Sequence, residues 1–235
     1  MVWGLSRSLP VAALAAALFT PLQAALERSA TLERFLALDD PNPTQYRALR
    51  HLEARNDHFK KSASMDVWTE GDVSGFRYQI VSEEGSEYIR NCVFRQTLET
   101  ERAMWASGAP DKAALTPENY VFADGGVQPD GSESLVVKPR RKDLLLIDGT
   151  LFLSPLDGDL IRVEGRLSKT PSFWTKHVQI TRWYKRFVGV RMPVALESTA
   201  SVRIAGQSTL LMTYQYESVN GTKFVTQQAV ISRSR

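Results

Sequence analysis

From residue 119 to the C-terminus, the chain is a succession of short alternating segments separated by turn residues. The segment GDLIRVEGRLSK (158–169) is typical: Arg162 and Glu164 point to one side, while Ile161, Val163 and Leu167 point to the other. A period of two predicts a strand with one wet and one dry face. Because such segments recur, with Gly and Asn-Gly in the connections, the pattern predicts an antiparallel meander.

Two helices are expected before the first strands. Residues 29–38 form a short apolar-periodic segment with Ser29 at the N-cap, and the DDPNP sequence after it stops a helix. Residues 44–56 also predict a helix, because three apolar residues follow helical spacing: Tyr46, Leu49 and Leu52.

A hairpin and a longer helix are expected next. Residues 59–71 and 75–84 alternate in the manner of strands and flank the turn sequence EGDVSG. Residues 86–106 then run without Gly or Pro, with Ser86 as the N-cap, which predicts a long helix. The later sequence IDGTLFLSP contains a turn signal at Asp148–Gly149.

These elements predict an α+β fold of nine or ten strands and two substantial helices. A wide antiparallel sheet must bury one face, so we expect it to curl into an unclosed half-barrel, with two or three helices covering the concave face. The chain of 235 residues is 43% hydrophobic and 23% charged, which is typical of globular proteins. We expect one domain, over residues 25–235.

The N-terminal 24 residues have the pattern of a secretory signal peptide. Arg7 precedes the apolar run VAALAAALFTPL, a small residue follows at Ala24, and the first acidic residue is Glu27. We expect cleavage near Ala24 and a periplasmic protein, with a retained N-terminal anchor as the alternative. The single cysteine, Cys92, excludes an internal disulfide.

Catalytic motifs are scarce. There are three histidines, and the sequence contains no H-E-x-x-H, C-x-x-C or G-x-S-x-G, so we expect neither an enzyme, a metal nor a cofactor. A dispersed Ser–His–Asp set would make a hydrolase, which is the least favoured alternative. Glu164, Glu197 and Glu217 occupy separate predicted strands, where solvated charges are commoner than a glycosidase pair.

Charge clusters add little to the functional assignment. Asp148, Asp157 and Asp159 are better explained by Asp-Gly turns than by a calcium loop. The basic run KPRRK (138–142) suits a solvated strand end, or contact with anionic lipid headgroups or an acidic partner. A net charge of +3 is too weak to indicate nucleic acid, and we expect no nucleic-acid partner.

Aromatic residues on the predicted strands are candidates for lining a ligand site: Phe76, Tyr78, Phe152, Trp183, Tyr214 and Tyr216. Strand aromatics also commonly fill an ordinary core. Phe173 and Trp174 lie in the predicted loop TPSFWTK, where an exposed pair marks a rim that contacts a membrane or a partner.

Two short motifs resemble the periplasmic outer-membrane lipoprotein-sorting proteins and their LolA-like relatives. The strand GFRYQ, with Phe76-Arg77-Tyr78, is similar to a Phe-Arg-Trp-type strand of that family. DGTLFLSP is similar to its Asp-Gly strand, in Asp148, Gly149, Leu151, Phe152 and Pro155. The long helix between these two strands departs from the family pattern.

The resemblance implies a lipid or lipoprotein carrier that holds acyl chains in an apolar trough. It would place the aromatic residues above, with Ile161 and Val163, in that trough, and Arg77 as a latch for the helical lid. The implied partners are a lipid or lipidated protein and a membrane-associated donor or acceptor, and we expect a monomer. The alternative is a regulatory or assembly module that binds a protein on the same concave face.

Overall fold

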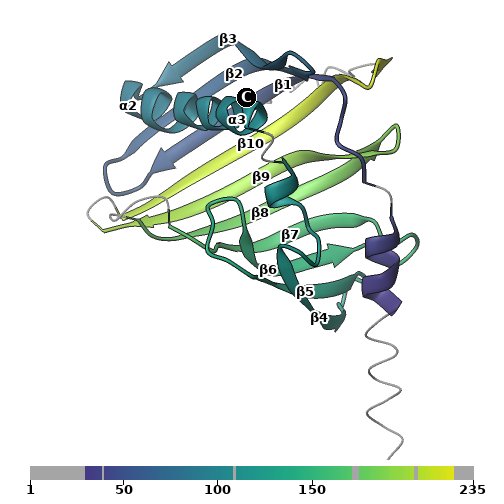
Figure 1. Cartoon of the computed structure of the whole chain (residues 1–235). Coiled ribbons are helices and arrows are strands. Elements are labelled where there is room, and N and C mark those ends of the chain that lie inside the picture. The colour runs from purple at the N-terminus through teal and green to yellow at the C-terminus, as the bar shows by residue number, and fades with distance from the viewer. Residues whose placement is uncertain (1–29, 39, 108–109, 171–174, 204–205, 225–235) are drawn as a thin grey trace, which may run out of the picture.

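The computed structural model describes residues 30–38, 40–107, 110–170, 175–203 and 206–224. Eleven strands form one antiparallel sheet (Figure 1). Their bounds are Tyr46–Asn56 (β1), Lys61–Asp72 (β2), Gly75–Gly85 (β3), Tyr120–Val127 (β4), Glu133–Pro139 (β5), Ile147–Leu153 (β6), Leu160–Leu167 (β7), Thr175–Phe187 (β8), Val190–Val202 (β9), Gly206–Val219 (β10) and Thr222–Lys223 (β11).

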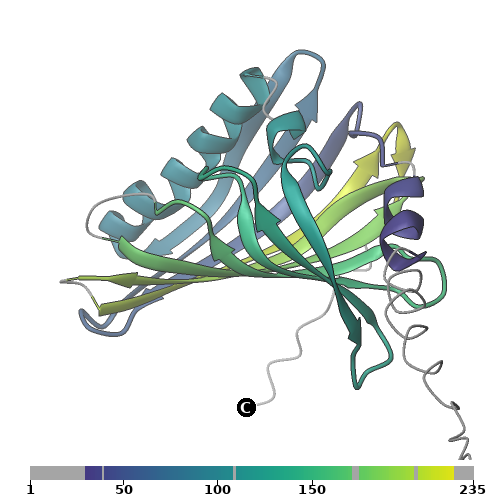
Figure 2. The ribbon, with the colours of Figure 1, turned by 60° about the horizontal axis from the view of Figure 1, so that its bottom comes forward.

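The sheet is open, and the expected α+β architecture is confirmed. Its strand order is β3-β2-β1-β10-β9-β8-β7-β6-β5-β4, with β11 paired to β10, so β3 and β4 form opposite edges. The sheet is strongly curved, and helical segments lie on one side of it (Figure 2).

The helix predicted over 86–106 is confirmed as three consecutive segments, α2 (Glu87–Ile89), a π-helical stretch (Arg90–Arg95) and α3 (Gln96–Ala106). Ser86 occupies the N-cap but makes no side-chain capping bond. Residues 30–37 form the expected N-terminal helix, and α4 (Pro110–Ala113) is a further short one. Among the described residues, no helix is long and apolar enough to cross a bilayer.

The prediction of a helix over 44–56 is wrong, because this segment is β1, paired with β2 and β10 in the middle of the sheet. Its buried side chains alternate strictly: Tyr46, Ala48, Arg50, Leu52 and Ala54. Because one of these buried residues, Arg50, is charged, the sequence does not show an alternation of apolar and polar residues.

The prediction of a turn at Asp148–Gly149 is also wrong. Both residues lie inside β6, where Gly149 is paired with Gly165 of β7. A Cβ on Gly149 would stand 2.0 Å from the backbone oxygen of Glu164. The two glycines therefore permit a close approach of β6 and β7, and the hairpin connection lies further along, at residues 154–159.

A bulge in β7 changes which of its side chains point into the core. Phe152 pairs with Arg162 but Leu153 pairs with Leu160, so Ile161 has no opposite residue. The irregularity turns Leu160 into the core beside Val163, each 2% exposed, while Ile161 is 40% exposed. The expectation that Ile161 and Val163 share the dry face is therefore wrong.

Two separate clusters bury the apolar residues. The first joins the 86–106 helix to β1, β2, β3 and β10, and includes Leu52, Met65, Phe94, Leu98 and Met212. The second joins the N-terminal helix to β4–β7, and includes Phe35, Tyr120, Leu135, Leu151 and Val163. Each end of the sheet thus has its own core and its own helix.

Candidate ligand-binding face

The register assigns side chains to two faces of the sheet, because directly opposite residues on paired strands point the same way. The inner face is the one against which the 86–106 helix packs. It carries the buried residues of β1 and their partners Met212, Tyr214 and Tyr216 on β10. The outer face carries the alternate residues, such as Leu49 and its partner Trp68.

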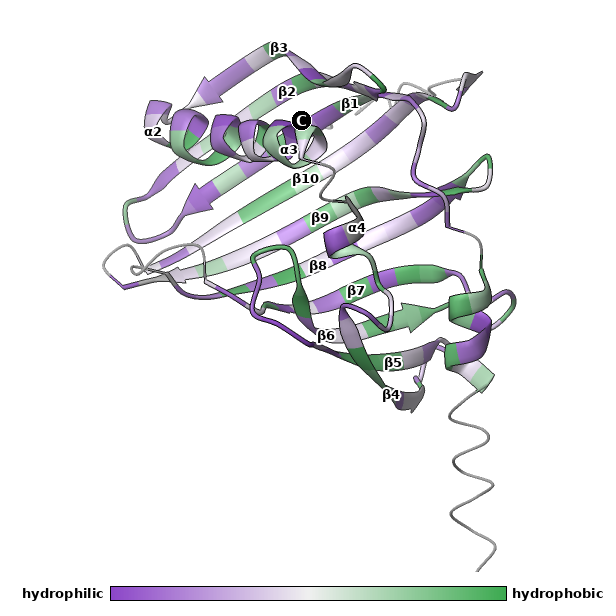
Figure 3. Cartoon of the chain, viewed as in Figure 1, coloured by the Kyte–Doolittle hydropathy of each residue, from purple (hydrophilic) through white to green (hydrophobic). Residues whose placement is uncertain are grey.

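A strip of β8–β10 on the inner face lies between the two cores. Its residues are Val178, Ile180, Arg182, Leu196, Ser198, Ala200, Leu210 and Tyr214. Leu196, Leu210 and Tyr214 are only partly buried, whereas Leu52 and Val67 nearer the helix are fully buried. Apolar stretches of β9 and β10 run through this region (Figure 3).

Neither helix of the two cores covers the strip fully. The 86–106 helix packs mainly on β2 and β3, and the helix at 30–37 contacts the second core through Leu32 and Phe35. In the view of Figure 1, α4 lies in front of the sheet near β8 and β9. The strip is therefore a half-covered apolar surface in the middle of a curved sheet.

A buried ion pair fastens the long helix to this face. Arg50 on β1 is 2% exposed and donates two hydrogen bonds to Glu101 on α3, at 2.5 and 2.7 Å. It also donates to the Tyr46 hydroxyl at 2.9 Å. Burial lowers the pKa of Arg50, but the adjacent Glu101 carboxylate outweighs this effect and the pKa is raised.

Aromatic rings complete the surroundings of Arg50. Its guanidinium carbon lies 4.7 Å from the Tyr214 ring centroid and 5.4 Å from that of Phe76. Desolvation raises the pKa of both Tyr46 and Tyr214, so both phenols stay neutral at physiological pH. Sequence analysis did not predict this site because residues 44–56 were predicted to form an amphipathic helix.

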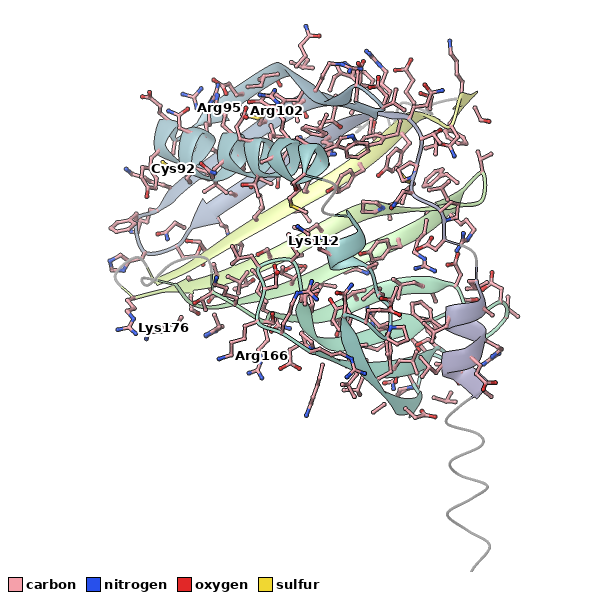
Figure 4. All side chains as sticks on the ribbon, viewed as in Figure 1. Cys92, Arg95, Arg102, Lys112, Arg166 and Lys176 are labelled. Carbon is pink, nitrogen blue, oxygen red and sulfur yellow. The ribbon has the colours of Figure 1, made fainter. Side chains whose placement is uncertain are left out.

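The other side of the helix is tied to β3. Arg90 and Arg95 each donate to Glu83 at 2.7 Å. The Arg102 guanidinium carbon lies 4.7 Å from the Tyr78 ring centroid, and the Tyr78 hydroxyl donates to Glu99 at 2.7 Å. Figure 4 shows Arg95 and Arg102 on the side of the helix toward β3. Cys92, on the same helix, is exposed.

The residues predicted to line the trough divide between the two faces. Phe76, Tyr78, Val163, Tyr214 and Tyr216 lie on the inner face. Phe152, Ile161 and Trp183 lie on the outer face, where the first and last are the neighbours of Arg162 on the adjacent strands.

The outer-face aromatics have a local partner. The Arg162 guanidinium carbon lies 4.1 Å from the Phe152 ring centroid, and its Nε lies 2.8 Å from Glu164. Arg77, the predicted latch, contacts Asp72, Ser74 and Glu70 of its own hairpin, and the arginine that reaches α3 is Arg50. Phe173 and Trp174 lie outside the described residues.

Two hollows lie at the end of the sheet where β1 turns into β2. Their volumes are about 520 and about 620 Å³. Charged residues contribute to both linings: Lys60, Lys61 and Glu87 in the first, and Glu53, Arg55 and Glu84 in the second. Neither lining has the apolar character expected of an acyl-chain site.

Two clusters among the described residues contain both serine and histidine, and neither forms a hydrolase triad. Asp66 bonds both His51 Nδ1, at 2.7 Å, and Ser82 Oγ, at 2.8 Å, so the carboxylate stands between them. Ser201 Oγ lies 3.1 Å from His177 Nε2, and no carboxylate contacts that imidazole among the described residues. The described part of the chain also contains no group of metal-ligating side chains.

No family model and no curated protein matches the sequence. Among solved structures, the fold is similar to a LolA superfamily protein from Nitrosomonas europaea, at 8% identity and a TM-score of 0.38, covering 80% of this chain and 91% of that one. It is also similar to a DUF1329 family protein from Desulfovibrio piger, at 10% identity and a TM-score of 0.34, covering 80% and 90%. These values do not establish membership of either family.

Proposed function

We propose that this chain is an exported, non-catalytic carrier that holds the acyl chain of a lipid or lipidated protein on the inner strip of β8–β10. In this proposal residues 1–24 direct export to the periplasm and residues 25–235 form a single monomeric carrier domain. The observation that carries the proposal is the strip between the two cores, in which Leu196, Leu210 and Tyr214 are only partly buried.

The energetics suit such a ligand. Each methylene removed from water contributes about 0.8 kcal/mol, so covering ten of them supplies roughly 8 kcal/mol without any catalytic group. An acyl chain on the strip would also cover Leu196 and Leu210, which the protein itself leaves partly exposed. The bond between Arg50 and Glu101 would keep α3 beside the ligand as one wall of the site.

A blocking substitution tests the location. Ser198 is half-buried on the inner face, opposite Leu210 on β10 and Ile180 on β8. Ser198→Trp should fill the strip and abolish binding of 11-(dansylamino)undecanoic acid, measured by fluorescence titration. Glu197→Trp is the matched control, because Glu197 is exposed on the outer face of the same strand.

Unchanged binding by folded Ser198→Trp protein would refute this location. Native mass spectrometry with organic extraction, on protein purified from a periplasm, tests the function itself. A stoichiometric bound lipid is expected; protein without lipid that also fails to bind the fluorescent probe would overturn the carrier proposal.

A further inference from the structure

We propose that Arg182 is an anion-binding residue in the strip, so that the ligand is an amphiphile with a carboxylate or phosphate headgroup. This inference rests on the proposed function and specifies the chemistry of its ligand. The argument uses the position of Arg182, its charge balance and the side chains around it.

The register places Arg182 in the middle of the inner face. It lies opposite Val163 on β7 and Leu196 on β9, and Leu196 in turn lies opposite Met212 on β10. Ile180 lies two residues before Arg182 on the same strand and face. A guanidinium therefore stands within a row of apolar side chains, at the boundary between the two cores.

The charge of Arg182 is not matched by an acid. Among the described residues, no carboxylate forms an ion pair with it. Arg50, on the same face, pairs with Glu101, and Arg186 and Arg191, near the turn between β8 and β9, pair with Asp159. Because a partly buried cation is costly without a counter-charge, a ligand anion at Arg182 would remove a penalty as well as gain a contact.

The surroundings of Arg182 supply phenol hydroxyl groups, and the nearby acid, Glu101, is already bonded to Arg50. Tyr184 lies two residues further along β8, beyond a bulge, and its side chain interacts with Arg182, while Tyr214 lies on the inner face of β10. The neighbouring Tyr184 contributes most to raising the pKa of Arg182, and Tyr214 and Glu101 add to this effect. A planar guanidinium flanked by phenol hydroxyl groups binds oxyanions through several directed hydrogen bonds.

The test compares two probes that differ in the headgroup. Oleate carries a carboxylate, and oleyl alcohol has the same chain without charge. Both are titrated by calorimetry with wild-type protein and with Arg182→Gln, Arg182→Lys and Lys185→Gln. Lys185→Gln is the matched control, because Lys185 is exposed three residues further along β8 and its loss changes the net charge equally.

Arg182→Gln should weaken oleate binding about tenfold to a hundredfold, as expected for a lost charge-assisted hydrogen bond. It should leave oleyl alcohol binding within about twofold, and Lys185→Gln should affect neither probe. Arg182→Lys should keep most of the oleate affinity, which also separates loss of charge from loss of folding.

Three outcomes would overturn the inference. Unchanged oleate binding by Arg182→Gln would leave the carrier function standing without a headgroup site. Equal loss of oleate and oleyl alcohol would make Arg182 a structural residue. Displacement of oleate by millimolar inorganic phosphate, without any acyl chain, would assign the site to a free anion. If wild-type protein bound neither probe, the proposed function itself would fail.

Discussion

Removing the acid from the buried pair should destabilise the protein strongly. In Glu101→Gln, Arg50 would keep its charge, its bond to the Tyr46 hydroxyl and its contact with the Tyr214 ring. Breaking a buried pair by removing one partner costs about 3–5 kcal/mol. The Glu101 side chain is 31% exposed, so water can approach and we expect the lower end, about 3 kcal/mol.

Urea unfolding followed by circular dichroism measures this loss from the midpoint at constant slope. In a domain of this size the melting temperature should fall by roughly 6–12 °C. Arg50→Met combined with Glu101→Leu should recover most of the stability, because an apolar pair of similar volume carries no desolvation penalty. A loss below about 1 kcal/mol, or a double variant as unstable as Glu101→Gln, would refute the reasoning.

Two further substitutions test local features. Partial burial lowers the pKa of His51, but hydrogen bonds with Glu53 and Asp66 outweigh this and raise it above 6.5. The charged imidazole therefore stabilises the folded state fully below about pH 6.5, and this stabilisation is lost as the pH rises through the folded pKa. His51→Gln should lower the free energy of unfolding by about 0.5 kcal/mol at pH 5.5 and leave it unchanged near pH 9. An equal loss at both pH values would contradict this. Gly149→Ala should cost about 3 kcal/mol, since its Cβ would meet the backbone oxygen of Glu164 at 2.0 Å. A urea midpoint close to wild type would show that β6 and β7 can separate.

Local patterns predicted much of the fold. The hairpin of β2 and β3 was visible from the alternation of its apolar residues, and the helix over 86–106 from a long run without Gly or Pro after Ser86. β1 was missed for a physical reason. The strand faces a helix that supplies Glu101, so it can bury Arg50 where a sequence pattern expects an apolar residue.

The candidate site was harder to predict than the fold. A single bulge beside Ile161 reverses the faces within β7, and no residue type marks it in the sequence. Phe152 and Trp183 were expected in the trough because they are aromatic. The strand register alone decides which face a side chain occupies, and it places both residues beside Arg162 on the outer face of the sheet. Nothing in the sequence around Arg182 indicates a binding residue, and only the pairing of the strands places it on the inner face.

The strand order has a consequence for how the protein assembles. Every neighbouring pair on the main path of the sheet is consecutive in sequence except β1 with β10. The hairpins of β1–β3 and of β4–β10 can form from local contacts, whereas the β1–β10 pairing joins distant parts of the chain and requires a large loop closure. The first core contains Leu52 and Met65 from one half and Met212 and Tyr216 from the other. We therefore expect β1–β10 pairing to be the slow step of folding, at which two locally formed halves become one cooperative unit.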